Sequence, residues 1–551
     1  MSRFVEFAEV AEATTPDQRQ KGRFVLRWEY LAIALIILLI AGIRFRLRDF
    51  PLERDEGEYA YAGQLILQGI PPYQVAYNMK LPGTYAAYAA IMAIFGETPA
   101  GIHIGVLLVS AASIFLIFLI TKELSDSTAA VVAGATFGLF CTRPVLLGLA
   151  GHATHFVTFA ALGSIVVLLK ACGTERYRLF FWSGLLSGLA FLMKQPGLFF
   201  AIFGGLYLCW REWPKAESRS QFLRKLGYFS AGVVLPYGIT CLILFRAGVF
   251  QRFWFWTVSY ARAYGSELSA WRGLLHFANG MAFQEENVFL IWLLVVAGMA
   301  AFLWDRRLRP NAPLVLGLLA CSFLALSAGI IYRPHYFILI YPVLAILAGV
   351  GVSSLARLLQ GTNLPRVLAV LPAVVFSVAF LNALYAERRI YFVESADKVA
   401  REIYGDVPFP EAQAIGKFIK DNSRRSDLLG VLGSEPEILF YANRISATGY
   451  MYTYPLMEDQ AYAMFMKSEY VHELESTKPE FLVSVMVTGS WFGQGNLDQG
   501  LLAWADNYLK EHYLLIGVAD GGNHDVFRWG TDATNYRARR PTVVLIYRRK
   551  R

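Results

Sequence analysis

Apolar runs of membrane-spanning length recur through most of this chain, and they leave few folds open to it. Of its 551 residues, 56% are hydrophobic and only 17% are charged. A helix of about 20 apolar residues crosses the hydrocarbon core of a bilayer. The sequence therefore predicts an α-helical polytopic membrane protein. The single runs are Tyr30–Ile43, Ile102–Ile120, Ala129–Leu147, Phe156–Leu169, Gly227–Phe245, Val288–Trp304, Pro313–Ile331, Tyr336–Leu355 and Val367–Leu384.

One further apolar stretch is too long for a single span. Residues 179–210 are apolar almost throughout, but Pro196-Gly197 interrupts them. Proline breaks a helix because it lacks an N–H donor and clashes with the preceding turn. We therefore expect two short helices that meet at Lys194-Gln195-Pro196, which brings the total to about eleven spans.

Basic residues predict the orientation of these spans. Short loops on one side carry an excess of Lys and Arg, as cytoplasmic loops do. The first run ends in Arg44-Phe45-Arg46 without a small-residue cleavage site, so we expect it to remain as an uncleaved anchor. Residues 1–29 are then a cytoplasmic tail, and residues 30–387 form the multi-pass membrane domain. The basic loop residues are Arg176, Arg178, Arg211, Lys215, Arg219, Arg224, Lys225, Arg306, Arg307 and Arg309.

The remaining composition excludes some partners and sites. The net charge of +9 is spread through loops that carry no nucleic-acid motif, so it indicates contact with membrane lipids and no nucleic acid. The five cysteines lie in or beside apolar runs and predict neither a disulfide framework nor a zinc site. Cations such as Lys80, Lys194 and Arg333 map to the outer face, against the topology rule. Bound anionic head groups would explain them.

Residues 388–551 differ in character from the rest of the chain. Short apolar strands at 428–432, 481–487, 513–518 and 542–547 alternate with helical segments. This alternation predicts a compact α/β domain with a partly parallel sheet, which we place on the extracytoplasmic face.

The densest polar segment is the outer loop of residues 44–100. Asp55 and Glu56 lie just past the first span, where carboxylates must be solvated, paired or used in chemistry. Helical spacing over 56–68, and a second short helix after Lys80, predict Tyr-rich amphipathic helices along the membrane surface. The other polar and aromatic residues of interest in this loop are Glu58, Tyr59, Tyr61 and Asn78.

An ordered set of motifs resembles the GT-C-type glycosyltransferases that use polyprenyl-phosphate sugars. Within that group it is most similar to family 39, the protein O-mannosyltransferases and lipid A aminoarabinose transferases. The resemblance covers roughly the first 385 residues, and the C-terminal domain is similar only in kind. The motifs are Asp55-Glu56 with Tyr59, Lys80-Leu81-Pro82-Gly83, Lys194-Gln195-Pro196 and Arg333-Pro334-His335-Tyr336-Phe337.

The resemblance implies an inverting transferase in the bacterial cytoplasmic (inner) membrane, with its active site outside the cytoplasm. The donor is a polyprenyl-phosphate-linked sugar, and the acceptor is a hydroxyl of a lipid, glycan or protein. Asp55, with Glu56 beside it, is the implied catalytic base. No cofactor is required where cations neutralise the leaving phosphate, and a divalent cation is left open. The implied phosphate ligands are Lys80, Arg333, Lys194 and His335; the implied substrate contacts are Glu58, Tyr59, Tyr61, Asn78 and Tyr336.

Each of these residues also has a structural interpretation. Asp55 can pair with Arg54, Lys80 can extend to the interface, and Arg333 can fix topology. Glu286 and Asn287 open a span on the same face, where they can contact substrate or cap a helix.

Two histidines outside the motifs are candidate metal ligands by their spacing. His152 and His155 have a spacing that can ligate a metal, but the sequence offers no third ligand nearby, so no metal site is predicted.

Two other classes of protein share many of these features. A transporter or flippase of lipid-linked or small substrates has many spans and intramembrane charges, but it should show interrupted helices in two similar halves, and the sequence has no internal repeat. A non-catalytic lipid-binding scaffold would explain the C-terminal domain but not the ordered acid–lysine–arginine set. Transfer activity of the purified protein discriminates among the three.

Overall fold

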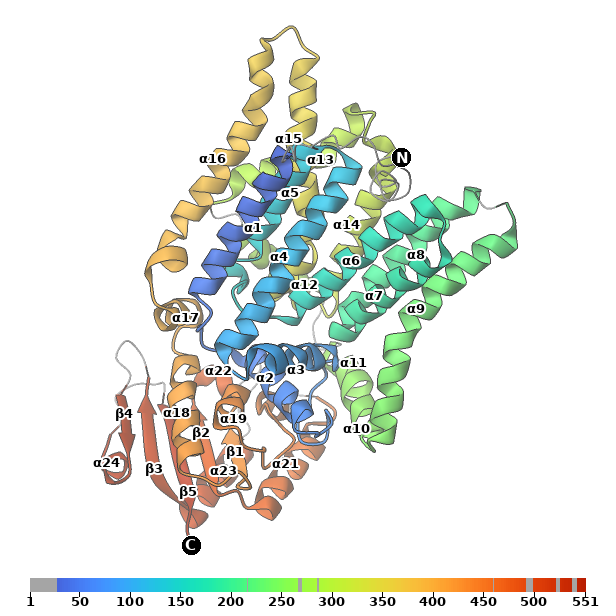
Figure 1. The fold of residues 1–551 in the computed structure, drawn as a ribbon. Helices are drawn as coiled ribbons and strands as arrows, with labels where there is room; N and C mark the ends of the chain where they lie inside the picture. The colour runs from blue at the N-terminus through green and yellow to red at the C-terminus, as the bar shows by residue number, and fades with distance from the viewer. Residues whose placement is uncertain are drawn as a thin grey trace, which may run out of the picture.

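The chain folds into a long helical bundle with a mixed α/β domain at one end (Figure 1). The computed structural model describes residues 27–215, 217–265, 270–284, 287–458, 460–491, 499–521, 526–537 and 543–551. The bundle helices are α1 (Trp28–Arg46), α4 (Pro99–Leu124), α5 (Ser127–Phe140), α6 (Ala153–Thr174), α7 (Tyr177–Met193), α8 (Leu198–Glu212), α9 (Arg219–Arg246), α13 (Phe289–Trp304), α14 (Ala312–Ser327), α15 (Tyr341–Gln360) and α16 (Leu371–Ala386).

The bundle belongs to a multi-pass membrane protein. Among the described residues, seven helical segments are long and apolar enough to cross a bilayer. The shorter apolar helices include α5, α7 and α13, which match predicted spans. Large apolar side chains such as Leu303 and Phe245 are 77% and 70% exposed in the isolated chain, as lipid-facing residues would be. The total of about eleven spans stays a prediction.

The predicted break in residues 179–210 is confirmed. Helix α7 ends at Met193, a short 3-10 turn covers Gln195–Gly197, and α8 starts at Leu198. Gly197 is required here, because a Cβ at this position would lie 2.1 Å from the carbonyl oxygen of Ala190. The break leaves Lys194 in extended backbone at the end of α7.

Two short helices form in the loop after α1, as predicted, but the first of them does not lie free on a membrane surface. They are α2 (Arg54–Leu67) and α3 (Gly83–Phe95), and Figure 1 shows them between the bundle and the C-terminal domain. Every residue of α2 from Glu56 to Leu65 is buried. Gly57 packs so closely on the C-terminal domain that a Cβ would lie 2.6 Å from Glu437. Protein contacts, not lipid, therefore cover this helix.

In the part of the C-terminal domain that the structure describes, five strands form a sheet in the order β1-β2-β5-β3-β4. β1 and β2 run parallel, and the other pairs are antiparallel, so the predicted partly parallel sheet is confirmed. β4, a short, half-buried strand, was not predicted from the sequence. The strands are β1 (Leu429–Leu432), β2 (Phe481–Met486), β3 (Tyr513–Asp520), β4 (Val526–Trp529) and β5 (Val543–Arg549). The longer helices are α17 (Ala396–Tyr404), α18 (Phe409–Asp421), α19 (Pro436–Ala442), α21 (Ala463–Thr477) and α23 (Gln499–His512).

Candidate functional site

The acidic motif forms the first turn of α2. Glu53 is the N-cap, and its carboxylate accepts a hydrogen bond of 2.9 Å from the backbone N–H of Glu56. The Glu56 side chain reaches back to the N–H of Glu53, which completes a capping box. Acidic side chains also stabilise the positive end of the helix dipole. The capping box thus determines where α2 begins, and with it the directions in which the side chains of Asp55 and Glu58 point.

Glu56 joins the motif to the bundle. Its Oε1 accepts hydrogen bonds from the backbone N–H of Gly151 and from Nε2 of His103, 3.0 Å away. The other nitrogen of His103 lies 2.8 Å from the carbonyl oxygen of Arg48, which can only accept. Both ring nitrogens therefore donate, so His103 is an imidazolium paired with the Glu56 carboxylate. Glu56 is fully buried, and its contacts favour a positioning role; a direct catalytic role stays a prediction.

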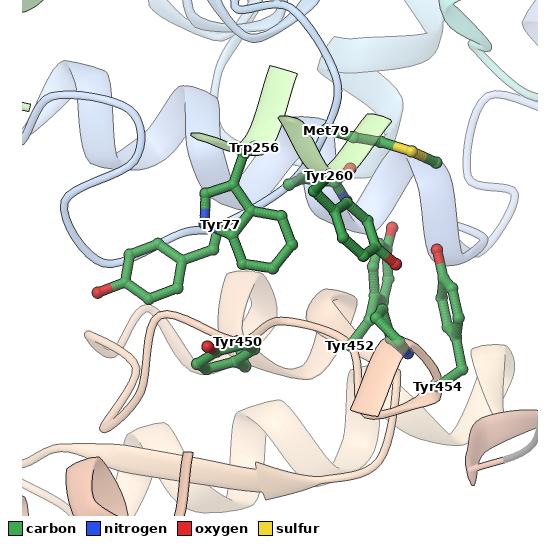
Figure 2. A pocket seen from close by; sticks show the side chains of 9 residues that line it. Tyr77, Met79, Trp256, Tyr260, Tyr450, Tyr452 and Tyr454 are labelled. Carbon is green, nitrogen blue, oxygen red and sulfur yellow. The ribbon is translucent and has the colours of Figure 1, made fainter. Parts of the chain in front are cut away.

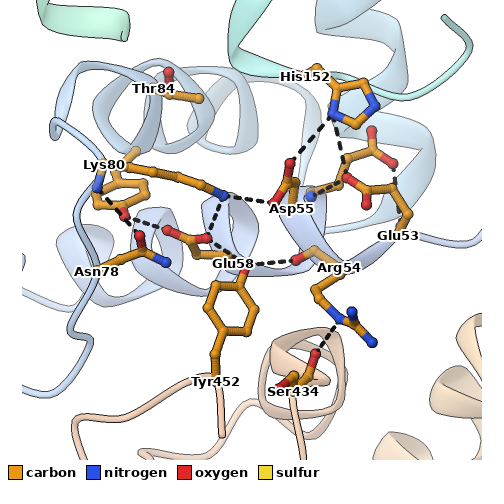
Figure 3. Close-up of polar contacts among 12 residues, drawn as sticks. Glu53, Arg54, Asp55, Glu58, Asn78, Lys80, Thr84, His152, Ser434 and Tyr452 are labelled. Atoms are coloured by element: carbon orange, nitrogen blue, oxygen red, sulfur yellow. Dashed lines mark hydrogen bonds and ion pairs between the residues drawn. The ribbon is translucent and has the colours of Figure 1, made fainter. Parts of the chain in front are cut away.

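Lys80 lies between two carboxylates of α2 (Figure 3). Its Nζ donates to Asp55 Oδ1 at 2.7 Å and to Glu58 Oε2 at 2.6 Å. Glu58 is fully buried, whereas the Asp55 side chain remains 25% exposed. Of these two carboxylates, only Asp55 is therefore open to a substrate.

Aromatic side chains enclose this ion pair. The hydroxyls of Tyr85 and Tyr452 donate to Glu58, and Lys80 Nζ lies 4.6 Å from the ring centre of Tyr59. Charge-assisted bonds of this kind are about twice as strong as neutral ones. Glu58 therefore anchors Lys80 and is itself held by three donors.

The charges at the site follow from these contacts. Burial raises the pKa of Asp55, but the Lys80 ammonium and the two histidines, His152 and His335, together outweigh it and hold the pKa well below the ordinary value of an aspartate. Burial raises the pKa of Glu58, and Lys80 offsets only part of that rise. Burial lowers the pKa of Lys80, but the two carboxylates reverse the effect and raise it well above its usual value. Asp55 is thus a carboxylate and Lys80 an ammonium at neutral pH.

Two histidines face the second oxygen of Asp55. His152 Nδ1 and His335 Nε2 each lie 3.7 Å from Asp55 Oδ2. Their rings stack with centroids 4.0 Å apart and planes 9° apart. His152 precedes α6, and His335 lies in the turn before α15. One potential ligand atom from each of Asp55, His152 and His335 lies within 4.8 Å of the others.

A third group of residues supplies positive charge. Lys194 Nζ lies 3.7 Å from the ring centre of Tyr336, a cation–π contact. Burial lowers the pKa of Lys194 to about 7, and the charges of Lys80 and Arg333 contribute in the same direction. The fold therefore brings together residues that were predicted from separate motifs. Lys194 interacts electrostatically with Asp55, Lys80 and Arg333. His335 lies 3.7 Å from Asp55.

An aromatic pocket adjoins the charged site (Figure 2). It lies where the outer loop, the π-helical segment Phe255–Tyr260 and the C-terminal domain meet. Tyr452 belongs to both places, because it lines the pocket and donates to Glu58. The lining residues are Tyr77, Asn78, Met79, Trp256, Tyr260, Tyr450, Tyr452, Tyr454 and Pro455.

The other predicted substrate contacts are placed differently. Asn78 lines the aromatic pocket and accepts from the backbone N–H of Lys80, at 3.3 Å. Tyr61 is buried against the C-terminal domain, where its hydroxyl accepts from the N–H of Ser446. Asn287 has a left-handed backbone before α13, and Glu286 lies outside the described residues.

Four contributors to the site were not predicted from the sequence. Tyr85 and Tyr452 bind Glu58, His103 pairs with Glu56, and Glu53 caps α2 and lies 3.6 Å from His152 Nδ1. Glu53 could have been found from the spacing Glu53–Glu56, since the capping-box geometry joins the N-cap with the third residue of the helix.

Comparisons with known proteins bear on what this site does. The family described as "Dolichyl-phosphate-mannose-protein mannosyltransferase" matches residues 80–239, a segment that starts at Lys80 and includes His152 and Lys194. Undecaprenyl phosphate-alpha-4-amino-4-deoxy-L-arabinose arabinosyl transferases of Pseudomonas aeruginosa and Pseudomonas paraeruginosa are each 28% identical over 284 residues. That alignment covers 44% of this chain and 49% of theirs, so the chain spans about half the length of the curated relatives it matches.

Solved structures decide the fold. ArnT from Cupriavidus metallidurans, bound to undecaprenyl phosphate, matches with a TM-score of 0.58 and 16% identity, over 94% of this chain and 98% of ArnT. The chain has the fold of ArnT. The apo oligosaccharyltransferase of Archaeoglobus fulgidus matches with a TM-score of 0.51 and 14% identity, over 92% of this chain and 75% of that one. The resemblance to GT-C-type glycosyltransferases that the motifs predicted is therefore confirmed, and the ArnT-like match extends into the C-terminal domain.

Proposed function

We propose that this chain is an inverting glycosyltransferase that moves a sugar from a polyprenyl-phosphate donor to an acceptor hydroxyl. The observation that carries the proposal is the placement of Lys80 between a buried carboxylate, Glu58, and a partly open one, Asp55. A base and a phosphate-binding cation in contact are what one-step displacement of a phosphate requires. The ArnT-like fold and the names of the curated relatives support it.

Asp55 is the proposed base. It removes the proton from the acceptor hydroxyl while the hydroxyl oxygen attacks the anomeric carbon. The bond from that carbon to the phosphate oxygen breaks, and the polyprenyl phosphate leaves with the electron pair. Before the donor binds, the Lys80 ammonium keeps Asp55 ionised. When this ammonium then moves toward the donor phosphate, the pKa of Asp55 rises and its carboxylate becomes a stronger base.

Lys80, Lys194 and Arg333 are the proposed phosphate ligands, with His335 beside them. A lipid phosphate that settles among these cations neutralises their mutual repulsion and stabilises the charge on the leaving group. This arrangement requires no cofactor for departure of the phosphate. Glu56 and His103 are proposed to position the motif, because both are buried in their own ion pair.

The aromatic pocket has only about 10 Å³ of free space, and it is proposed to line the path of the sugar or the acceptor once it widens. Ligand sites combine apolar and aromatic walls with a few placed polar groups, and Asn78 and the tyrosine hydroxyls supply such groups here. The acceptor class remains a hydroxyl of a lipid, glycan or protein. We propose that the site and the C-terminal domain face the extracytoplasmic side of the bacterial inner membrane, because the basic short loops lie at the opposite end of the spans.

The experiment that tests this function is release of polyprenyl phosphate from a polyprenyl-phosphate sugar by the purified protein in detergent. Asp55→Asn should lower the rate by ~10²–10⁴-fold, the usual effect of losing a general base, while donor binding is retained. Asp49→Asn is the matched control, since Asp49 is a nearby exposed aspartate that pairs with Arg48. Equal rates for Asp55→Asn and wild type would remove Asp55 from the mechanism.

A further inference from the structure

An open apolar cavity lies where α8 meets α9, far from the candidate site. Its volume is about 420 Å³, within the ~300–1,000 Å³ that is usual for ligand pockets. Figure 1 shows α9 running from this connection to α10 (Phe250–Trp254), which contacts the C-terminal domain, so the cavity lies at the far end of α9. The proposed transfer uses none of the residues that line it. They are Cys209, Trp210, Trp213, Pro214 and Phe222.

Aromatic rings form the walls of the cavity. A 3-10 turn, Trp213–Lys215, follows the end of α8 and precedes α9. The ring of Trp213 stands edge-on to that of Phe222, with centroids 5.0 Å apart and planes at 90°, a favourable arrangement for two aromatic rings. Trp210 and Trp213 are nevertheless 45% and 58% exposed. Exposed tryptophans at the end of a span are typical of the membrane interface, so lipid is the expected cover of this cavity.

A buried ion pair fixes the shape of the connection. Lys225 of α9 donates to Oε2 of Glu212, the last residue of α8, at 2.7 Å. The two side chains are 2% and 0% exposed. Removing either partner would leave an uncompensated buried charge, which is strongly unfavourable. The pair therefore holds the ends of α8 and α9 together, and it neutralises the Glu212 carboxylate.

Two basic side chains come from the segments that line the cavity. Lys215 ends the 3-10 turn, and Arg219 lies one helical turn before Phe222, on the same face of α9. Lys215 Nζ lies 3.7 Å from Glu212 Oε1, which is too long for a hydrogen bond. Residues 211–225 carry five Lys or Arg side chains and only two carboxylates. This excess of positive charge favours an anionic occupant.

We propose that the cavity binds an acidic phospholipid, with an acyl chain against the aromatic walls and the phosphate beside Lys215 and Arg219. The apolar walls and the adjacent cations match the two parts of such a lipid. A zwitterionic lipid with the same chains has no net charge and is held more weakly. Unspecific contact with the bilayer would give no preference between the two. The lipid belongs to the leaflet opposite the candidate site, so it is distinct from the proposed sugar donor.

The test counts lipids on the full-length protein, delipidated in detergent, by native mass spectrometry. Phosphatidylglycerol and phosphatidylcholine with identical chains are added in equal amounts. Wild type should retain phosphatidylglycerol in preference. Lys215→Gln and Arg219→Gln should each weaken its binding by about fivefold, the usual contribution of one basic residue at a membrane surface. Trp213→Ala should weaken the binding of both lipids by about tenfold or more, because it removes an apolar wall.

Matched controls separate this cavity from the rest of the surface. Lys170→Gln removes an exposed cation near the end of α6, and Trp182→Ala removes a half-exposed tryptophan of α7. Neither residue lines the cavity, so both variants should bind phosphatidylglycerol as wild type does. Lys80→Ala combined with Arg333→Ala weakens the proposed donor pocket and should leave the affected phosphatidylglycerol site unchanged.

Equal retention of the two lipids by wild type would overturn the inference, as would an unchanged preference in Lys215→Gln combined with Arg219→Gln. Displacement of phosphatidylglycerol from this cavity by a smaller amount of polyprenyl phosphate would also overturn it, because the occupant would then be a polyprenyl lipid. Lipid retention is measured without sugar donor or acceptor. A failure here therefore leaves the proposed transfer untouched, and an inactive protein that retains phosphatidylglycerol fails only as a transferase.

Discussion

The hydroxyl of Tyr452 donates a hydrogen bond to the buried carboxylate of Glu58, a residue 394 positions earlier in the chain. Glu58 in turn holds Lys80, so a side chain of the C-terminal domain fixes the cation of the candidate site. Arg54 makes a second connection between α2 and the C-terminal domain, because it donates to Glu435 and to the carbonyl oxygen of Ser434. The C-terminal domain is thus part of the site, not an appendage to it.

Tyr452→Phe is expected to weaken transfer while the fold is retained. The change removes one of three donors to Glu58 and keeps the ring that lines the aromatic pocket. A hydrogen bond to a charged group contributes ~1.5–3 kcal/mol, which corresponds to a loss of about 10- to 100-fold in kcat/KM if Lys80 loses its position. The measurement is the rate of polyprenyl-phosphate release over a range of donor concentrations.

Tyr470→Phe is the control for that variant. Tyr470 is also buried in the C-terminal domain, but its hydroxyl donates to the carbonyl oxygen of Val431, away from the site. It should lower thermal stability slightly and leave kcat/KM unchanged. If both variants lose activity to the same degree, Tyr452 acts only through the stability of its domain.

The local features of this protein were predictable from sequence. The break at Pro196 and the helix in the acidic motif depend on neighbouring residues, and periodicity and proline chemistry report those directly. Most charged residues of the candidate site, though not Glu53 or His103, were also singled out, because lysine, arginine and carboxylates at span ends are costly to keep and therefore conspicuous.

The long-range partners were not predictable. His152 was paired in the sequence analysis with His155, three residues away, whereas the fold stacks it on His335. Tyr452 is one of 29 tyrosines, and only the packing of α19 on α2 brings its segment to Glu58. The surface placement of α2 failed for the same reason: an amphipathic pattern does not distinguish a helix covered by lipid from one covered by another domain.

Lys194 predicts a pH dependence of donor capture. Burial lowers its pKa to about 7, so the ammonium is present below that pH and is lost as pH rises through it. Only the protonated form attracts phosphate. We expect kcat/KM for the donor to fall as pH rises above about 7, because that parameter reports the free enzyme. At saturating donor, the fall in kcat should occur at higher pH, because the bound phosphate stabilises the Lys194 ammonium.

Lys194→Arg distinguishes this lysine from other titrating groups. The guanidinium stays charged throughout the range, so the fall above neutral pH should disappear even if the overall rate is lower. Persistence of the same fall in Lys194→Arg would assign it to another group.

Cysteine labelling tests the proposed sidedness. Ser476 is exposed on α21 of the C-terminal domain, and Asn363 is exposed in the loop between α15 and α16 at the opposite end of the bundle (Figure 1). Ser476→Cys should react with an impermeant maleimide in intact spheroplasts, and Asn363→Cys only after lysis. Wild type corrects for the native cysteines, of which Cys141, Cys172 and Cys321 are buried. The reverse pattern would place the C-terminal domain in the cytoplasm.

Lys80 and Arg333 are expected to act on one lipid phosphate although they lie far apart in the sequence. Both charges act on Lys194, which places them around a common centre. Lys80→Ala and Arg333→Ala should each raise the KM for the donor and lower kcat, because each removes a cation from the leaving group. When either cation has been removed, the phosphate is already weakly bound. Removal of the second cation should therefore cost less transition-state free energy.

The double variant measures this coupling. Its loss of transition-state free energy should fall short of the sum of the two single losses by ~0.5–3 kcal/mol, the range for residues that share a partner. Arg48→Ala combined with Lys80→Ala is the matched control, since Arg48 is an exposed cation of the same loop that contacts Asp49 and Phe45. That pair should be additive. If Lys80 and Arg333 are also additive, the two cations serve separate sites, and the phosphate pocket proposed between them has to be abandoned.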